Sequence, residues 1–129
     1  MTVTGVADTH TALWYLFGDD RLSADAAAFV NEAAQARQNI AVSSITLAEI
    51  VYLVEKGRLP VAVYEDIKKA LADPEHVFIE AVFTSEIVDA MRRVARAEVP
   101  DMPDRMIAAT ALHFNVPVMR ANSLMPWSR

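Results

Sequence analysis

Short apolar runs and helical stripes of apolar residues alternate along the chain. Four runs rich in β-branched residues predict strands, over residues 3–7, 40–43, 77–82 and 116–120. Apolar residues three and four positions apart predict the helices between them: over 11–17, from Ser23 onward, over 46–56, between Pro60 and Asp73, from Thr84 onward, and from the Pro100–Pro103 loop to about Asn115. Strands separated by helices predict an α/β fold of three layers, α/β/α, with a central, mainly parallel sheet of about four to five strands.

Capping signals mark the ends of several of these helices. Ser23 and Thr84 are suitable N-cap residues, and Gly57 stands in the C-cap position of the helix over 46–56. The apolar positions after Thr84 predict one long buried stripe, made up of Ile87, Val88, Met91, Val94 and Ala95.

The length and apolar content of the chain predict a single domain over residues 1–129. A chain of 129 residues is long enough for one hydrophobic core and too short for two. No apolar stretch approaches the ~18 residues of a membrane span, so no membrane partner is expected. The absence of cysteine and of an N-terminal signal pattern predicts a cytoplasmic protein.

The net charge and the high content of apolar residues indicate which kinds of partner the protein has. A net charge of −5 argues against a protein that binds nucleic acid by phosphate neutralisation alone, but not against an enzyme whose metal ions meet the phosphate. Hydrophobic residues make up 53% of the chain, more than one core requires. The helix over 46–56 is apolar on almost every side, which predicts a homodimer interface or a partner surface there; burial against the 60–71 helix is the alternative.

Three acidic residues stand where a strand ends or a helix begins. Asp8 follows the first strand, and N-capping of the next helix is an equally good interpretation of it. Glu49 completes a capping-box pattern with Thr46, but Ser43 or Ser44 could cap this helix instead. Glu49 also shares its helix face with apolar residues and is expected to point inward. Asp104 lies in a first helical turn, where it suits the helix dipole, but its face is apolar as well.

The topology brings these three carboxylates to one edge of the sheet. In an α/β fold the carboxyl ends of parallel strands and the N-termini of the following helices share an edge, where ligands bind. Carboxylates about 5 Å apart repel by roughly 3 kcal/mol at an effective dielectric of 20, so such a cluster requires a cation or a proton. Hard oxygen ligands without cysteine favour Mg²⁺ or Mn²⁺, ions that support phosphodiester hydrolysis.

Three stretches of the sequence resemble the PIN-domain ribonucleases of the VapC toxin type. They are "VADTHTALWYL", "VSSITLAEIVYLVEKGRL" and "DMPDRMIAATALHFNVPVM", and the match extends from Val3 to about Leu124. The resemblance implies a metal-dependent endoribonuclease, with RNA as substrate, that a cognate antitoxin protein inhibits. It also implies that Asp8, Glu49 and Asp104 are the catalytic residues and the ligands of Mg²⁺ (or Mn²⁺).

The resemblance assigns supporting roles as well. Thr9 is expected to orient Asp8, and Asp101 is a secondary acidic candidate. After the last strand the family usually has a threonine and then an acid, where this chain has Arg120 and Asn122. Asn122 can offer an oxygen but no charge, and Arg120 is either a phosphate contact or an exposed surface charge.

Two other functions compete with catalysis by RNA cleavage. The first is a PIN-like module that binds RNA or a partner with little or no turnover, an alternative that the uncharged Asn122 supports. The second is a phospho-receiver domain, suggested by Asp19-Asp20, but the later strands offer neither the acceptor aspartate nor the lysine that it requires. His10 is interpreted as a helix-entry or packing residue rather than a catalytic base.

Overall fold

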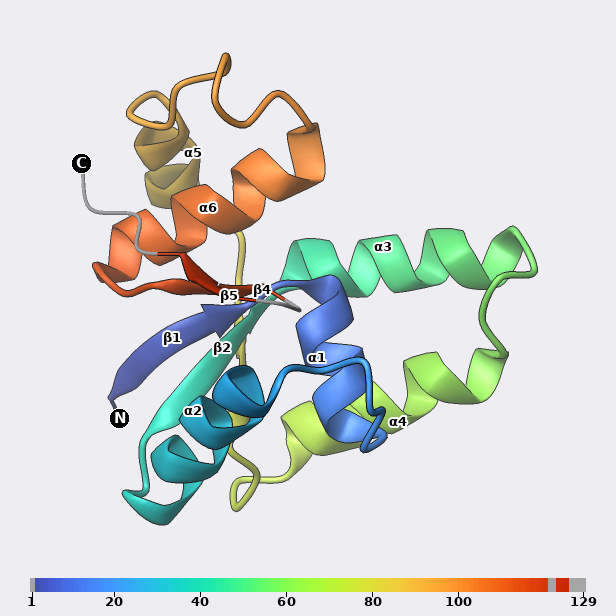
Figure 1. Ribbon diagram of the computed structural model, residues 1–129. Helices are drawn as coiled ribbons and strands as arrows, with labels where there is room; N and C mark the ends of the chain where they lie inside the picture. The colour runs from blue at the N-terminus through green and yellow to red at the C-terminus, as the bar shows by residue number, and fades with distance from the viewer. Residues whose placement is uncertain (1, 121–122, 126–129) are drawn as a thin grey trace.

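A five-stranded sheet lies at the centre of the computed structural model, which describes residues 2–120 and 123–125 (Figure 1). The strand order is β3-β2-β1-β4-β5. Four strands are parallel, and β5 pairs antiparallel with β4. Their bounds are β1 (Val3–Ala7), β2 (Asn39–Ser43), β3 (Phe78–Ala81), β4 (Val118–Arg120) and β5 (Ser123–Met125). The predicted mainly parallel sheet of four to five strands is therefore confirmed.

Six helices cover the sheet within the described residues. They are α1 (Thr9–Leu16), α2 (Ala24–Gln35), α3 (Ser44–Glu55), α4 (Val61–Ala72), α5 (Ser85–Met91) and α6 (Met102–Phe114). Helices α5 and α6 lie on one face of the sheet, and α1, α2 and α4 lie on the other (Figure 1). This arrangement confirms the predicted three-layer α/β/α fold.

Side chains that alternate along the strands fill two separate cores. On the α6 side the buried cluster comprises Val6, Ala41, Ala81, Ile107, Ala111 and Val118. On the other side a larger cluster includes Ile40, Val42, Phe78 and Met119, packed against α1, α2, α3 and α4. Because successive residues of a strand point to opposite faces, each position can be assigned to one of the two layers.

Helix α2 packs very close to β1 at Gly5. A Cβ atom at this position would lie 3.0 Å from a ring carbon of Phe29 and 3.6 Å from the sulfur of Met119. A larger residue would therefore push α2 away from the sheet.

The connection after α5 departs from the predicted stripe. Helix α5 ends at Met91, and Val88 is 46% exposed while Ala95 is exposed too, so the expectation that both are buried is wrong. The guanidinium of Arg105 donates to the carbonyl groups of Met91 (3.0 Å) and Val94 (3.2 Å). The Arg105 side chain thus bonds carbonyl groups that a longer α5 would pair with its own amides, and the chain turns here.

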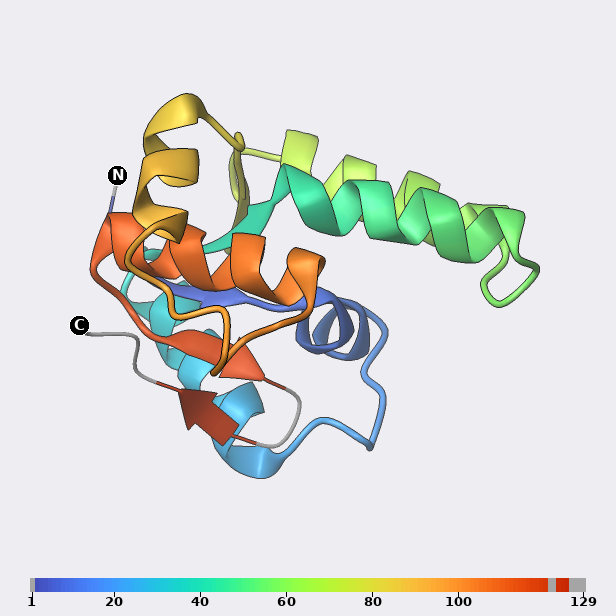
Figure 2. The same ribbon diagram turned by 90° about the horizontal axis from the view of Figure 1, so that it is seen from above.

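Helix α3 continues directly from β2 and extends beyond the sheet. Its N-cap is Ser43, whose hydroxyl accepts from the amide of Ile45, so it begins two residues before the predicted start. The C-cap residue is Lys56, and Gly57, predicted at that position, is the next residue and ends the helix with a positive φ of 71°. Figure 2 shows α3 and α4 side by side as a projecting pair.

Within the residues described, none of the helices combines the length and the apolar character that a membrane crossing would require.

Candidate active site

Four acidic residues lie at the carboxyl edge of the parallel strands. Asp8 follows β1, and Glu49 is in the second turn of α3, which starts where β2 ends. Helix α6 brings its N-terminal residues Asp101 and Asp104 to the same edge. The sheet therefore gathers the acids predicted from the sequence, at the edge where α/β folds place ligands.

Asp8 caps α1 and keeps one carboxylate oxygen available. Its Oδ1 accepts a hydrogen bond from the amide of Thr11 at 2.9 Å, which fixes the side chain at the end of β1. Oδ2 accepts no hydrogen bond from the residues that the structure describes. The capping interpretation is thus correct, and it leaves an oxygen that could bind a ligand.

Glu49 is held by a threonine rather than by its own helix. Ser43 caps α3, so the serine alternative is confirmed and the capping-box interpretation of Glu49 is wrong. Instead, the hydroxyl of Thr9 donates to Glu49 Oε1 at 2.5 Å and lies 3.2 Å from the hydroxyl of Thr46. Thr9 is only 5% exposed, whereas Glu49 is half-buried, so the hydroxyl holds the carboxylate from its buried side. Thr9 was expected to orient Asp8, but its hydroxyl orients Glu49.

Asp101 and Asp104 together form the start of α6. Asp101 is the N-cap, and its Oδ2 accepts from the amide of Asp104 at 3.1 Å. Asp104 was expected to face inward, but its side chain is exposed. The buried residues of α6 begin only at Ile107, one turn after Asp104.

The carboxylates at this edge influence one another's ionisation. Burial raises the pKa of Glu49 above its ordinary value, the Thr9 hydrogen bond opposes that rise, and the charges of Asp104 and Asp101 add to it. Partial desolvation likewise raises the pKa of Asp104, with further contributions from Asp101 and Asp8. A cation at the edge would relieve this repulsion.

The donor type at this edge fits a hard divalent cation. Asp8, Glu49 and Asp104 offer only oxygen atoms, the ligands that Mg²⁺ and Mn²⁺ prefer. However, no group of three or more His, Cys, Asp or Glu side chains in the described part of the chain is arranged so that it could hold a metal ion. Asn122, the fourth expected contributor, lies outside the described residues.

His10 lies in the first turn of α1 and packs on Trp14, in agreement with the helix-entry or packing role expected for it, and it also lies at the acidic edge. Its ring is exposed and contacts Trp14, with 5.6 Å between the ring centroids. Its charge lowers the pKa of both Glu49 and Asp104, after the larger effect of burial that raises them. The direct succession Asp8-Thr9-His10 was the one sequence signal for this position.

Comparisons with known proteins agree with the fold described above. The model of the PIN domain family matches residues 6–123. VapBC2 from Rickettsia felis, bound to a DNA fragment from the promoter, is similar in structure with a TM-score of 0.64 and 18% identity, over 90% of this chain and 86% of that one. A toxin-antitoxin complex from Klebsiella pneumoniae is similar with a TM-score of 0.56 and 22% identity, over 89% of this chain and 83% of that one.

A search of curated proteins finds no match to this sequence. The family match nevertheless covers most of the chain and includes all four acidic positions, so this chain belongs to the PIN domain family.

Proposed function

We propose that this protein is a cytoplasmic, metal-dependent endoribonuclease and the toxin of a toxin–antitoxin pair. The observation that carries the proposal is the gathering of Asp8, Glu49 and Asp104 at the carboxyl edge of a PIN-domain sheet. Proteins of this family generally use divalent metal ions, and the two structural relatives are toxin–antitoxin proteins.

Asp8, Glu49 and Asp104 would hold Mg²⁺ or Mn²⁺ through their free oxygens. A bound ion of this kind supplies an activated water and neutralises charge on the phosphodiester. The chain's own contribution is orientation: the Thr11 amide fixes Asp8, and the Thr9 hydroxyl fixes Glu49. Asp101 fixes the first turn of α6, which carries Asp104.

The direct test is an RNA cleavage assay on protein purified free of any antitoxin. We expect cleavage of structured RNA or mRNA with Mg²⁺ or Mn²⁺, and none with a chelator. Cleavage that persists in the chelator, and is equally fast in the Asp8→Asn protein, would indicate a contaminating nuclease and contradict the proposal.

A PIN-like module that binds RNA or a partner with little turnover is the second candidate. Two observations favour it: the described acidic side chains are not arranged as a complete metal site, and Asn122 replaces an acid. Binding of RNA without metal-dependent cleavage in the same assay would support this alternative.

The proposed antitoxin would dock next to the acidic edge. A hollow of about 460 Å³ between α1 and the α3–α4 pair begins at His10 and is lined mainly by apolar side chains, which include Leu13, Trp14, Phe17, Leu53, Leu59 and Val63. An antitoxin segment in this hollow could place a basic side chain beside Asp8 and Glu49, where it would replace the cation's charge.

We also propose a homodimer formed through the outer side of α3. Val51 and Tyr52 are 40% and 56% exposed on this helix, and Val61 at the start of α4 is 64% exposed. Val54, by contrast, packs against the core. The exposed apolar surface of α3 is therefore narrower than the sequence suggested.

A further inference from the structure

Arg120 ends β4 directly beside Asp8. Met119 pairs with Ala7 in the parallel register of β4 and β1, and the amide of Asp8 donates to the carbonyl of Met119 at 3.0 Å. The next residue along each strand is therefore Arg120 on β4 and Asp8 on β1. Both are at the carboxyl edge of the sheet.

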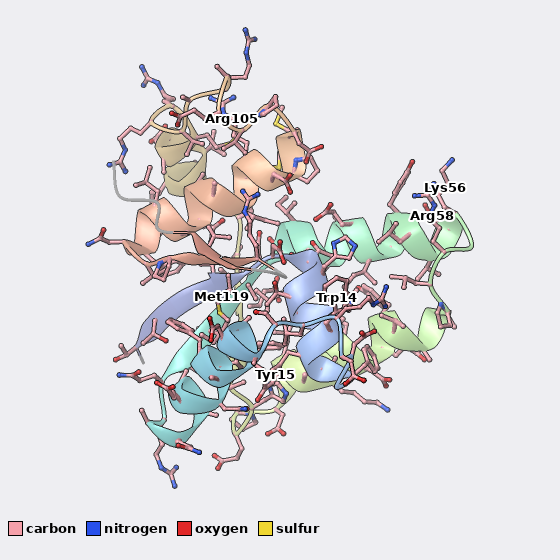
Figure 3. All side chains as sticks on the ribbon, in the orientation of Figure 1. Trp14, Tyr15, Lys56, Arg58, Arg105 and Met119 are labelled. Atoms are coloured by element: carbon pink, nitrogen blue, oxygen red, sulfur yellow. The ribbon has the colours of Figure 1, made fainter. Side chains whose placement is uncertain are left out.

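The alternation of side chains places Arg120 on the α6 side of the sheet. Met119 is buried among the residues of the α2 side, where Figure 3 shows it between the sheet and α2. Val118, two residues before Arg120, is buried on the α6 side with Ile107 and Ala111. Since residues two apart in a strand share a face, Arg120 points to the layer in which α6 carries Asp104.

The charge of Arg120 is close to the acids but is not neutralised by them. The side chain is half-buried, and no carboxylate among the described residues is near enough to form an ion pair with it. It still acts on Asp104: desolvation and Asp101 raise the pKa of that carboxyl, and Arg120 lowers it. A half-buried cation of this kind has donors available for an anion.

We propose that the Arg120 guanidinium binds a phosphate of the RNA backbone at the acidic edge. This inference rests on the proposed RNA cleavage, and it deepens that function by naming the residue that holds the substrate. An arginine offers a planar fork of donors that matches two phosphate oxygens, and it stays charged at any working pH. In a chain of net charge −5, a cation beside four acids also offsets the repulsion between the site and RNA.

The proposal predicts opposite effects on RNA and on metal when the charge is removed. Arg120→Gln should weaken RNA binding, because a charge-assisted hydrogen bond is lost. It should tighten Mn²⁺ binding, because a positive charge beside the carboxylates disappears. An arginine that only supported the fold would not change the two affinities in opposite directions.

The first measurement is the affinity for a short, labelled, single-stranded RNA in a chelator, followed by fluorescence anisotropy over a range of salt concentrations. Arg120→Gln should lower the affinity about tenfold, a loss typical of one hydrogen bond to a charged group. The slope of log affinity against log salt should become shallower by about 0.7, as expected for one phosphate contact on a single strand. Arg120→Lys should keep the slope and recover part of the affinity.

Arg37→Gln is the matched control. Arg37 is exposed in the connection that leads into β2, at the opposite edge of the sheet, and glutamine there makes the same change of charge and size. We expect this variant to bind RNA and Mn²⁺ as the unchanged protein does. A salt slope that is the same in the Arg120→Gln and unchanged proteins would overturn the proposal.

The second measurement is the Mn²⁺ affinity by calorimetry, with a thermal melt of each variant. No gain in Mn²⁺ affinity, or unfolding of both the glutamine and lysine variants, would show a structural role and overturn the proposal. Failure of the proposed function would look different. The unchanged protein would then bind RNA through Arg120 but would not cleave it. Cleavage with an unchanged KM in Arg120→Gln would instead overturn this inference alone.

Discussion

At the scale of single residues, one buried hydroxyl connects two distant parts of the site. Thr9 and Glu49 are 40 residues apart, and their hydrogen bond joins the start of α1 to the second turn of α3. Without it, Glu49 would be free to rotate away from the edge. The bond also stabilises the ionised form of Glu49, because it opposes the burial that raises the pKa of this group.

We expect Thr9→Val to weaken Mn²⁺ binding and cleavage about tenfold or more while the fold persists. Valine keeps the shape of threonine but donates no hydrogen bond, and a hydrogen bond to a charged group contributes about 1.5–3 kcal/mol. The measurement is Mn²⁺ calorimetry together with the cleavage rate. Thr110→Val is the control, since its buried hydroxyl donates to the carbonyl of Met106 within α6, away from Glu49. Equal metal affinity in the two variants would show that Thr9 does not position Glu49.

His76 gives the fold a dependence on pH. Its Nδ1 accepts the amide of Phe78 at 3.0 Å, which requires a neutral ring, and burial lowers its pKa below the ordinary 6.5, against a smaller opposite effect of Asp73. The unfolded chain takes up the proton more readily than the folded one. The stabilisation of the fold by the neutral His76 ring is therefore complete above about pH 6.5. It is lost as the pH falls through the lower pKa that His76 has in the folded protein.

Urea unfolding at pH 7.5 and pH 5 tests this contribution. We expect the unchanged protein to lose more free energy of unfolding between the two pH values than His76→Gln does. His113→Gln, at an exposed position of α6, should behave like the unchanged protein. An identical pH dependence in all three proteins would contradict the role assigned to His76.

At the scale of secondary-structure elements, local patterns located the helices but not all of their ends. Gly57 correctly marked the end of α3, whereas the Ser43 cap starts the helix two residues before the predicted position. The end of α5 depends on Arg105, which is 14 residues beyond Met91, and no local pattern contains that information. The sequence also suggested apolar residues around most of α3, whereas the packing of α4 leaves only part of it exposed.

We expect Val51→Glu to convert a dimer into a monomer without unfolding it. Val51 is exposed on α3, so a charge there would disturb the proposed dimer surface without being buried in the protein's own core. Light scattering gives the mass, and a thermal melt gives the stability. Lys68→Glu, at an exposed position of α4, is a control for an added negative charge. A protein that is monomeric before the substitution would rule out the interface.

At the scale of the whole molecule, the position of the site could be predicted because it follows from topology. Parallel strands joined by helices bring their carboxyl ends to one edge, so the sequence predicts Asp8, Glu49 and Asp104 together there, whereas only the family resemblance pointed to Asp101. The hydrogen bonds within the site could not be predicted. They depend on which hydroxyl meets which carboxylate after packing, as the contact of Thr9 with Glu49 shows.

The central claim is that the acids at this edge form one metal-dependent catalytic centre. The most direct test is the rate of RNA cleavage with Mn²⁺ for Asp8→Asn, Glu49→Gln and Asp104→Asn, beside Asp66→Asn at an exposed position of α4. We predict that the cleavage rate of each of the first three variants falls to the level of the chelator control, while Asp66→Asn cleaves normally. The free energy of unfolding of these three variants without metal should be unchanged or higher. Undiminished Mn²⁺-dependent cleavage by the folded Asp104→Asn protein would contradict the claim.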